Sequence, residues 1–282
     1  MDKVYVVTRN DNYNLANSES YCNRKFITAP LTCVSMKANY PKCDPSGYLI
    51  QNHELYRVNL TTGRSTIVSD STGSAVNAMG YNIFDDYLYA SNFAYGNAYL
   101  VKIGGSGVAA TVSQLPISST GLNWNIGDVD ERGQYWASYN GEGWIKVDAD
   151  ARSETYGKVV ASGVADTLGY TPIDWAYVPG AGDYLWALGY TGAYNETQLM
   201  RFDRTAHTWS LQTNFGNVVG RNAWGAVYAA RGEALVGSEN VSGEVWKFPL
   251  LTGKDAEFLA MGPASNNNDG ARCINAIEEN RS

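Results

Sequence analysis

The chain has 282 residues, of which 44% are hydrophobic and 17% charged, so it is long and apolar enough to bury a sizeable core. Lysine and arginine number 21 against 28 aspartates and glutamates, which gives a formal net charge of −7. Proteins that bind nucleic acid usually carry clusters of lysine and arginine that contact the phosphates. The excess of acidic residues therefore argues against a nucleic-acid partner. No segment approaches the roughly 18–20 apolar residues of a membrane-spanning helix. The 29 glycines and 20 tyrosines predict many short strands joined by glycine turns.

The four cysteines and three glycosylation motifs indicate the compartment. Cysteine and histidine are too sparse and too scattered for a zinc site, and no cysteine belongs to a CxxC pair. An even number of cysteines in an acidic, glycine-rich chain predicts two disulfides and an oxidising environment. Acceptor motifs for N-linked glycans begin at Asn59, Asn195 and Asn240. We therefore expect a secreted protein, with Met1 as a start codon added to a trimmed chain.

Residues 1–47 precede the repetitive part of the sequence, and in them only residues 3–8 resemble a strand. From residue 48 onward, a strand with an apolar, basic, apolar pattern recurs about every 47 residues. Its basic positions are Arg57, Lys102, Lys146, Arg201 and Lys247. Because side chains alternate along a strand, each basic side chain points to one face of the sheet and its apolar neighbours point to the other. We interpret the basic residues as having a structural role.

Two further strand types precede these strands, the first in all five units and the second in four of them. One follows a glycine or aspartate turn and begins at Tyr48, Tyr87, Tyr135, Tyr184 and Ala234. The other is rich in small residues, which suit the innermost strand of a propeller blade, and covers residues 77–80, 126–129, 173–176 and 224–227. Four strands per unit of about 40–50 residues predict a β-propeller, and the units number five.

The C-terminus supplies the strand that the first unit lacks. No inner strand precedes residue 48, whereas residues 269–276 have the expected composition, so we predict that the ring closes with a C-terminal inner strand. Cys43 and Cys273 then lie side by side and form a disulfide, which leaves Cys22 to pair with Cys33. The predicted organisation is an extension of residues 1–47 packed on a propeller of residues 48–282. A sixth, degenerate blade is the alternative.

Four stretches carry a resemblance to a known family: residues 43–51, 127–136, 176–180 and 267–273. They resemble secreted propeller-like proteins of fungi and actinobacteria that are grouped as a domain of unknown function. The resemblance extends from about Cys43 to the C-terminus. It implies an extracellular propeller, and it supplies neither an activity nor catalytic residues.

Carboxylates on the predicted inner strands are the candidates for catalysis. Asp128, Asp130 and Asp174 would face the axial funnel, where a pair of acids can hydrolyse or eliminate a glycosidic bond. The structural interpretations are hydrogen bonds to backbone amides or a structural calcium. No base, nucleophile and orienting group are recognisable together, and we expect no cofactor.

Aromatic residues near the inner strands suggest binding instead. Aromatic faces stack on sugar rings while polar groups bond the hydroxyls, although propellers also pack aromatics between blades. The candidates are Trp124, Tyr139, Trp175, Tyr177 and Trp224, with Asp269 and Arg272 as polar partners. The favoured prediction is a non-catalytic module for extracellular or cell-wall carbohydrate or another cell-surface ligand. A glycan-active hydrolase or lyase and a protein-binding adhesive domain are the alternatives.

Overall fold

The computed structural model describes residues 40–118, 123–192, 196–230 and 234–276, and the backbone of two short strands before them. The chain divides into the units Met1–Asn39 and Tyr40–Ser282. In the first unit, β1 (Tyr21–Cys22) pairs antiparallel with β2 (Cys33–Val34), and Cys22 stands opposite Cys33. The Cys22–Cys33 disulfide involves side chains outside the described ones and stays a prediction. So does the packing of the extension on the propeller.

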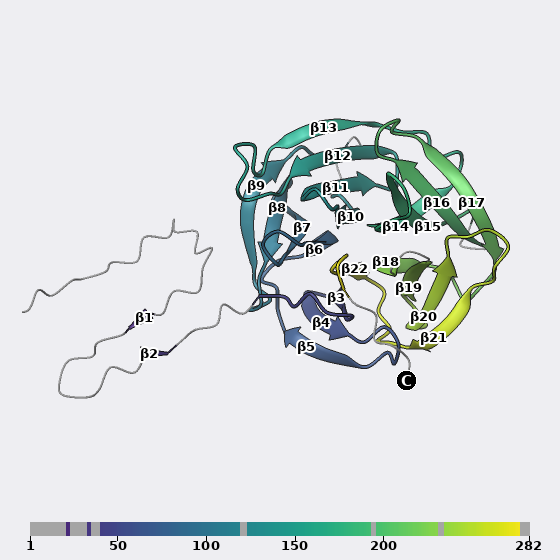
Figure 1. Ribbon diagram of the computed structural model, residues 1–282, viewed down its shortest axis with the longest axis horizontal. Coiled ribbons are helices and arrows are strands. Elements are labelled where there is room, and N and C mark those ends of the chain that lie inside the picture. The colour runs from purple at the N-terminus through teal and green to yellow at the C-terminus, as the bar shows by residue number, and fades with distance from the viewer. Residues whose placement is uncertain are drawn as a thin grey trace, which may run out of the picture. The chain divides into compact units, whose positions relative to one another are not determined.

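The second unit consists of five antiparallel sheets of four strands each, arranged as blades around a common axis (Figure 1). Blade 1 contains β22 (Asn268–Ala271), β3 (Gly47–Gln51), β4 (Glu54–Val58) and β5 (Ser65–Ser69). Blade 2 contains β6 (Val76–Asn82), β7 (Tyr87–Ala94), β8 (Asn97–Ile103) and β9 (Ala109–Leu115). Blade 3 contains β10 (Ile126–Val129), β11 (Gln134–Tyr139), β12 (Gly143–Asp148) and β13 (Val159–Val164). Blade 4 contains β14 (Thr171–Tyr177), β15 (Tyr184–Tyr190), β16 (Thr197–Asp203) and β17 (Trp209–Gly216), and blade 5 contains β18 (Trp224–Ala230), β19 (Ala234–Glu239), β20 (Glu244–Pro249) and β21 (Glu257–Met261). The predicted five-bladed propeller is confirmed, and the described residues form no sixth blade.

The ring closes as predicted, with a strand from the C-terminal end. β22 pairs antiparallel with β3, so that Ala271 stands opposite Tyr48. Cys43 and Cys273 form a disulfide beside this pair. The closing strand ends at Ala271, opposite Tyr48, and is shorter than the predicted 269–276. A turn follows instead, in which the Ala276 N–H donates to the Cys273 carbonyl.

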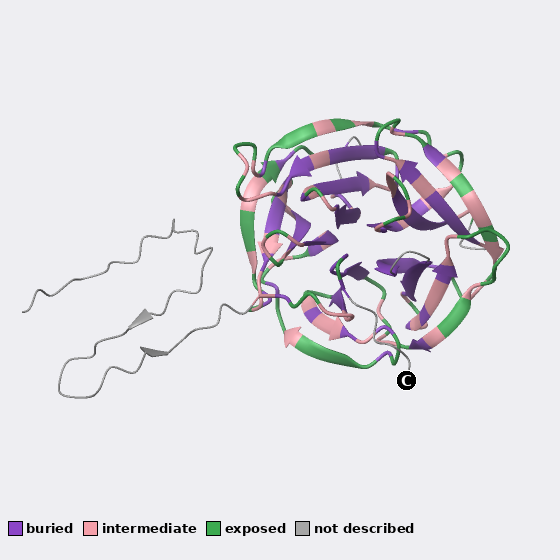
Figure 2. Cartoon of the chain, viewed as in Figure 1, coloured by how far each residue is buried: buried purple, intermediate pink, exposed green. Residues whose placement is uncertain are grey.

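Hydrophobic core fills the spaces between neighbouring blades. The inner two strands of the blades are mostly buried, whereas the outer strands are mostly exposed or half-buried (Figure 2). Inner strands approach one another so closely that only glycine fits at some positions. A Cβ atom on Gly80 would lie 2.3 Å from the Val129 nitrogen, and one on Gly127 would lie 2.3 Å from the Ala78 oxygen. The small residues of the predicted inner strands therefore permit this contact between blades 2 and 3.

The recurring basic residues have a structural role in blades 2, 3 and 4. In each of these blades the cation lies over an aromatic ring of the second strand, as Lys102 does over Tyr87 and Lys146 over Trp136. Arg201 lies over Tyr184 in the same way, with 4.1 Å between the guanidinium carbon and the ring centroid. In blade 1, Arg57 pairs with Asp44 instead. The structural interpretation of the basic repeat fits these contacts.

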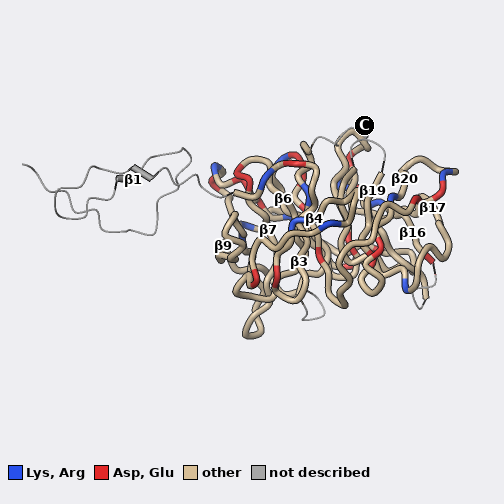
Figure 3. The backbone as a smooth tube through the Cα atoms, turned by 90° about the horizontal axis from the view of Figure 1, so that it is seen from below, with Lys and Arg blue, Asp and Glu red and all other residues tan. Residues whose placement is uncertain are grey.

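Charged residues of both signs are interspersed around the described ring when it is seen from the side (Figure 3). In that part of the chain no helix is long and apolar enough to cross a membrane.

Candidate functional site

Three of the acidic side chains singled out in the sequence lie near the propeller axis. Asp128, Asp174 and Asp269 stand on the inner strands β10, β14 and β22, and each is at most 4% exposed. Each uses one oxygen for the N–H of the next residue and the other for an N–H of the next blade in the ring. The amides from the neighbouring blades belong to Tyr177 for Asp128, Val227 for Asp174 and Met79 for Asp269, each at 2.8 Å. These aspartates thus join the inner strands of consecutive blades.

Burial controls the ionisation of these three carboxyl groups. Loss of hydration on burial raises the pKa of Asp128 to about 8. The hydrogen bonds from the Tyr177 and Val129 N–H groups favour the charged form and lower the pKa, but burial has the larger effect. The pKa values of Asp174 and Asp269 are likewise raised, first by burial and then by the charges of the other axial carboxyls. Among the described residues, no three acidic, histidine or cysteine side chains are grouped so that they could hold a metal ion.

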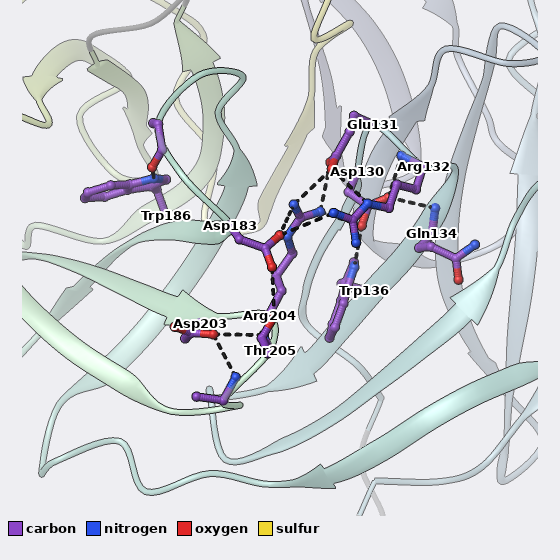
Figure 4. A network of polar contacts seen from close by, with 12 residues as sticks. Asp130, Glu131, Arg132, Gln134, Trp136, Asp183, Trp186, Asp203, Arg204 and Thr205 are labelled. Carbon is purple, nitrogen blue, oxygen red and sulfur yellow. Dashed lines mark hydrogen bonds and ion pairs between the residues drawn. The ribbon is translucent and has the colours of Figure 1, made fainter.

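Asp130 lies apart from the axial group, in a polar cluster between blades 3 and 4. The turn between β16 and β17 carries Arg204, whose side chain is only 4% exposed, into contact with the turn that follows β10. Arg204 donates to Asp130 at 2.7 Å and to Glu131 at 2.8 and 3.0 Å, and it also binds Asp183 (Figure 4). Asp130 further accepts the Trp136 indole N–H at 2.9 Å. The buried guanidinium is therefore surrounded by carboxylates.

The same cluster borders a small pocket of about 340 Å³. Arg204 lies over the ring of Tyr177, with 4.5 Å between the guanidinium carbon and the ring centroid. Lys146 covers the ring of Trp136, which is 2% exposed. Partial burial alone would raise the pKa of Glu131, but the hydrogen bonds and the positive charge of Arg204 lower it below its usual value. The charged groups at this pocket mainly bind one another, and its aromatic rings are covered.

The predicted aromatic ligand residues are distributed over the cores between blades. Trp124, Trp175 and Trp224 are at most 3% exposed. The indole N–H of Trp124 donates to the Pro116 carbonyl, and that of Trp224 donates to the Thr197 hydroxyl.

The remaining predicted ligand residues do not form one exposed surface either. Tyr177 is 8% exposed beneath Arg204, and Tyr139 is half-buried. Arg272 is 8% exposed and donates to the Ala229 carbonyl across the contact between blades 5 and 1. Of the predicted set, the structure brings together the three axial aspartates, and it places Asp130 beside Tyr177.

A groove between blades 4 and 5 contains aromatic rings that reach the surface. This blade 4–5 groove has a volume of about 540 Å³ and lies between β17 and the β20–β21 segment. Half-buried Phe215 and Trp246 line it, and its other lining residues include Thr213, Asn214, Asn217, Lys254 and Asp255. The sequence predictions did not include this groove, because its two rings are on different blades. The one sequence feature that pointed to this groove was Trp246, which directly precedes the basic residue Lys247 of β20.

The rings in the blade 4–5 groove are held in fixed orientations. Trp246 donates its indole N–H to Glu244 at 2.8 Å and packs edge-on against Phe258. Phe215 packs in the same manner against Phe248, with 5.3 Å between ring centroids. Asn214 and Asn217, both exposed, line the same groove, and the amide of Asn214 is held by Glu196 and the Gly216 N–H. Rigid aromatic faces next to polar side chains are the usual composition of a small-molecule site.

The fold and these sites define a five-bladed β-propeller with buried axial carboxyls and a peripheral aromatic groove. The profile of a family described as a repeat of unknown function (DUF6923) matches residues 48–275, and the chain belongs to this family. No curated protein matches the sequence.

Solved structures with a similar backbone have low sequence identity to this chain. A nidogen–laminin complex is 9% identical at a TM-score of 0.47, with 81% of this chain and 98% of that chain covered. A functionally unknown protein from Desulfotomaculum acetoxidans is 12% identical at a TM-score of 0.47, with 85% and 91% covered. Apo AztD from Citrobacter koseri is 10% identical at a TM-score of 0.39, with 78% of this chain and 56% of that chain covered. This chain thus spans little more than half the length of AztD.

Proposed function

We propose that this protein is a secreted, non-catalytic recognition module that binds extracellular carbohydrate in the blade 4–5 groove. The observation that carries the proposal is the pair Phe215 and Trp246, two rings from neighbouring blades in one groove of about 540 Å³. Sugar rings present apolar C–H faces that stack on aromatic rings. Fixed rings lose little freedom when a ligand binds, which favours affinity.

Polar side chains beside the rings complete a carbohydrate site. Asn217, Lys254 and Asp255 are exposed along the groove and offer both donors and acceptors, whereas the amide of Asn214 is engaged by Glu196 and the Gly216 N–H. Sugar hydroxyls both donate and accept hydrogen bonds, so a mixed set of side chains suits them better than a site of one charge. The Cys43–Cys273 disulfide is compatible with the proposed extracellular location.

The axial carboxyls support binding over catalysis. Asp128, Asp174 and Asp269 each accept two backbone N–H groups and lie buried between inner strands. A general acid or nucleophile must reach the scissile bond, whereas these groups are engaged in joining blades. Asp130 is similarly engaged by Arg204 and Trp136.

Retention on a panel of extracellular and cell-wall polysaccharides tests the proposal. We expect Trp246→Ala and Phe215→Ala to weaken binding of the retained polysaccharide at least tenfold, and Trp246→Phe to keep most of it. Tyr95→Ala is the matched control, because Tyr95 is a fully exposed aromatic residue in the β7–β8 turn, far from the groove in the sheet order. Unchanged binding by Trp246→Ala would contradict the proposal. Release of sugar products by the wild type, lost in Asp174→Asn, would favour a glycan-active enzyme instead.

A further inference from the structure

Two acceptor motifs for N-linked glycans lie in described turns of the propeller. Asn59, Leu60 and Thr61 form the first, between β4 and β5, and Asn240, Val241 and Ser242 form the second, between β19 and β20. The third motif, at Asn195, lies outside the described residues. The glycan is attached to the side-chain nitrogen Nδ2, so the surroundings of that amide decide whether a folded chain can carry it.

The amide of Asn59 is arranged so that a glycan leaves its turn intact. Its oxygen Oδ1 accepts the N–H groups of Thr61 at 3.0 Å and Thr62 at 2.9 Å, and both threonines are exposed. Backbone hydrogen bonds between Asn59 and residues 63 and 64 close the turn independently. Within the described residues, Nδ2 of Asn59 has no hydrogen-bond partner. A glycosylated amide keeps its carbonyl oxygen, so these contacts survive attachment.

The amide of half-buried Asn240 lies against β18 of blade 5. A Cβ atom on Gly225 of β18 would lie 2.1 Å from Oδ1 and 2.8 Å from Nδ2 of Asn240, so the amide occupies the space that glycine leaves open. The Oδ1 atom is inaccessible to solvent. The hydroxyl of Ser242 donates to the fully buried Glu239 at 2.8 Å. A glycan on Nδ2 would start from an amide held against Gly225 and would crowd the contact between β18 and the β19–β20 turn.

We infer that Asn59 is a glycan attachment site of the folded protein and that Asn240 is not, although both begin acceptor motifs. The inference rests on the proposed secretion, and it is independent of the carbohydrate groove. In the attachment step, an oligosaccharyl transferase takes the sugar from a lipid diphosphate donor. The bond between the sugar C1 and the diphosphate oxygen breaks, a C1–Nδ2 bond forms, the lipid diphosphate leaves, and Nδ2 loses one proton.

The test uses the full chain, secreted from a eukaryotic host behind a leader peptide. Peptide mass spectrometry is applied to the monomeric, disulfide-bonded fraction before and after removal of N-glycans. The Asn59 peptide is expected mainly in the glycosylated form and the Asn240 peptide unmodified. Thr61→Ala removes the motif while Asn59 and its Oδ1 contacts stay in place, so it should abolish the glycan at Asn59. The matched variant Ser242→Ala should leave the total glycan mass unchanged.

Two results would overturn the inference: a glycan on Asn240 in the folded fraction, or an unmodified Asn59 in that fraction. Neither measurement involves binding of sugar, so failure here and failure of the carbohydrate groove are distinguishable.

Discussion

Replacement of Asp128 by asparagine should change how the stability of the propeller depends on pH. Burial raises the pKa of Asp128 from 3.8 to about 8, so the folded state holds this proton more tightly than the unfolded state does. Its contribution to stability is therefore complete below about pH 4 and is lost as the pH rises toward 8. A difference of about four pH units, at about 1.4 kcal/mol for each, sets an upper limit of about 6 kcal/mol.

The asparagine variant has no such proton to lose. Its side-chain oxygen keeps one acceptor for Val129 or Tyr177, but its NH₂ group faces the other N–H, where the protonated acid presents a hydroxyl oxygen that can still accept. An unsatisfied buried N–H costs about 1–3 kcal/mol, so the variant should be less stable than the wild type near pH 4. As the pH rises, the wild type loses stability relative to the variant, and the order should reverse by pH 8.

Urea unfolding at pH 4.5, 6 and 8 measures the two free energies of unfolding. Asp70→Asn, a change at an exposed aspartate, is the control and should follow the wild type at every pH. A difference between wild type and Asp128→Asn that stays constant from pH 4.5 to 8 would refute the reasoning.

Two further predictions concern the closure and the contact between blades 3 and 4. Replacement of Cys43 and Cys273 by serine removes a bridge across a sequence separation of 230 residues, and chain entropy alone should lower the free energy of unfolding by about 5 kcal/mol. An unchanged urea midpoint would show that the bridge does not hold the ring closed. Arg204→Met leaves the buried Asp130 without its cation and should cost about 3–5 kcal/mol in the same assay. Arg152→Met removes an exposed ion pair with Asp150 and should leave the midpoint unchanged, so equal effects of the two variants would contradict a special role for Arg204.

Most of the fold was predictable because its determinants are local and repeat. Each basic residue of a third strand pairs with a residue of the second strand, as Lys146 of β12 pairs with Trp136 of β11. The small inner strands follow from close contact between blades, as at Gly80 and Gly127. The closure followed from counting strands. The bounds of the closing strand did not, because they depend on its pairing with β3, which is distant in the sequence.

The sites were less predictable because they depend on contacts between distant parts of the chain. Arg204 meets Glu131 across 73 residues, and no local pattern marks such a pair. The sequence alone does not distinguish a tryptophan that packs in a core from one that lines a groove. Trp175 and Trp224 are buried, whereas Trp246 is half-buried.

A crystal structure with an oligosaccharide from the polysaccharide that the protein retains tests the proposed recognition site most directly. The expected result is a sugar ring stacked on Trp246 or Phe215, with hydroxyls bonded to side chains such as Asn217, Lys254 or Asp255. A sugar bound instead at the propeller axis, beside Asp128, Asp174 and Asp269, would contradict the blade 4–5 groove as the binding site.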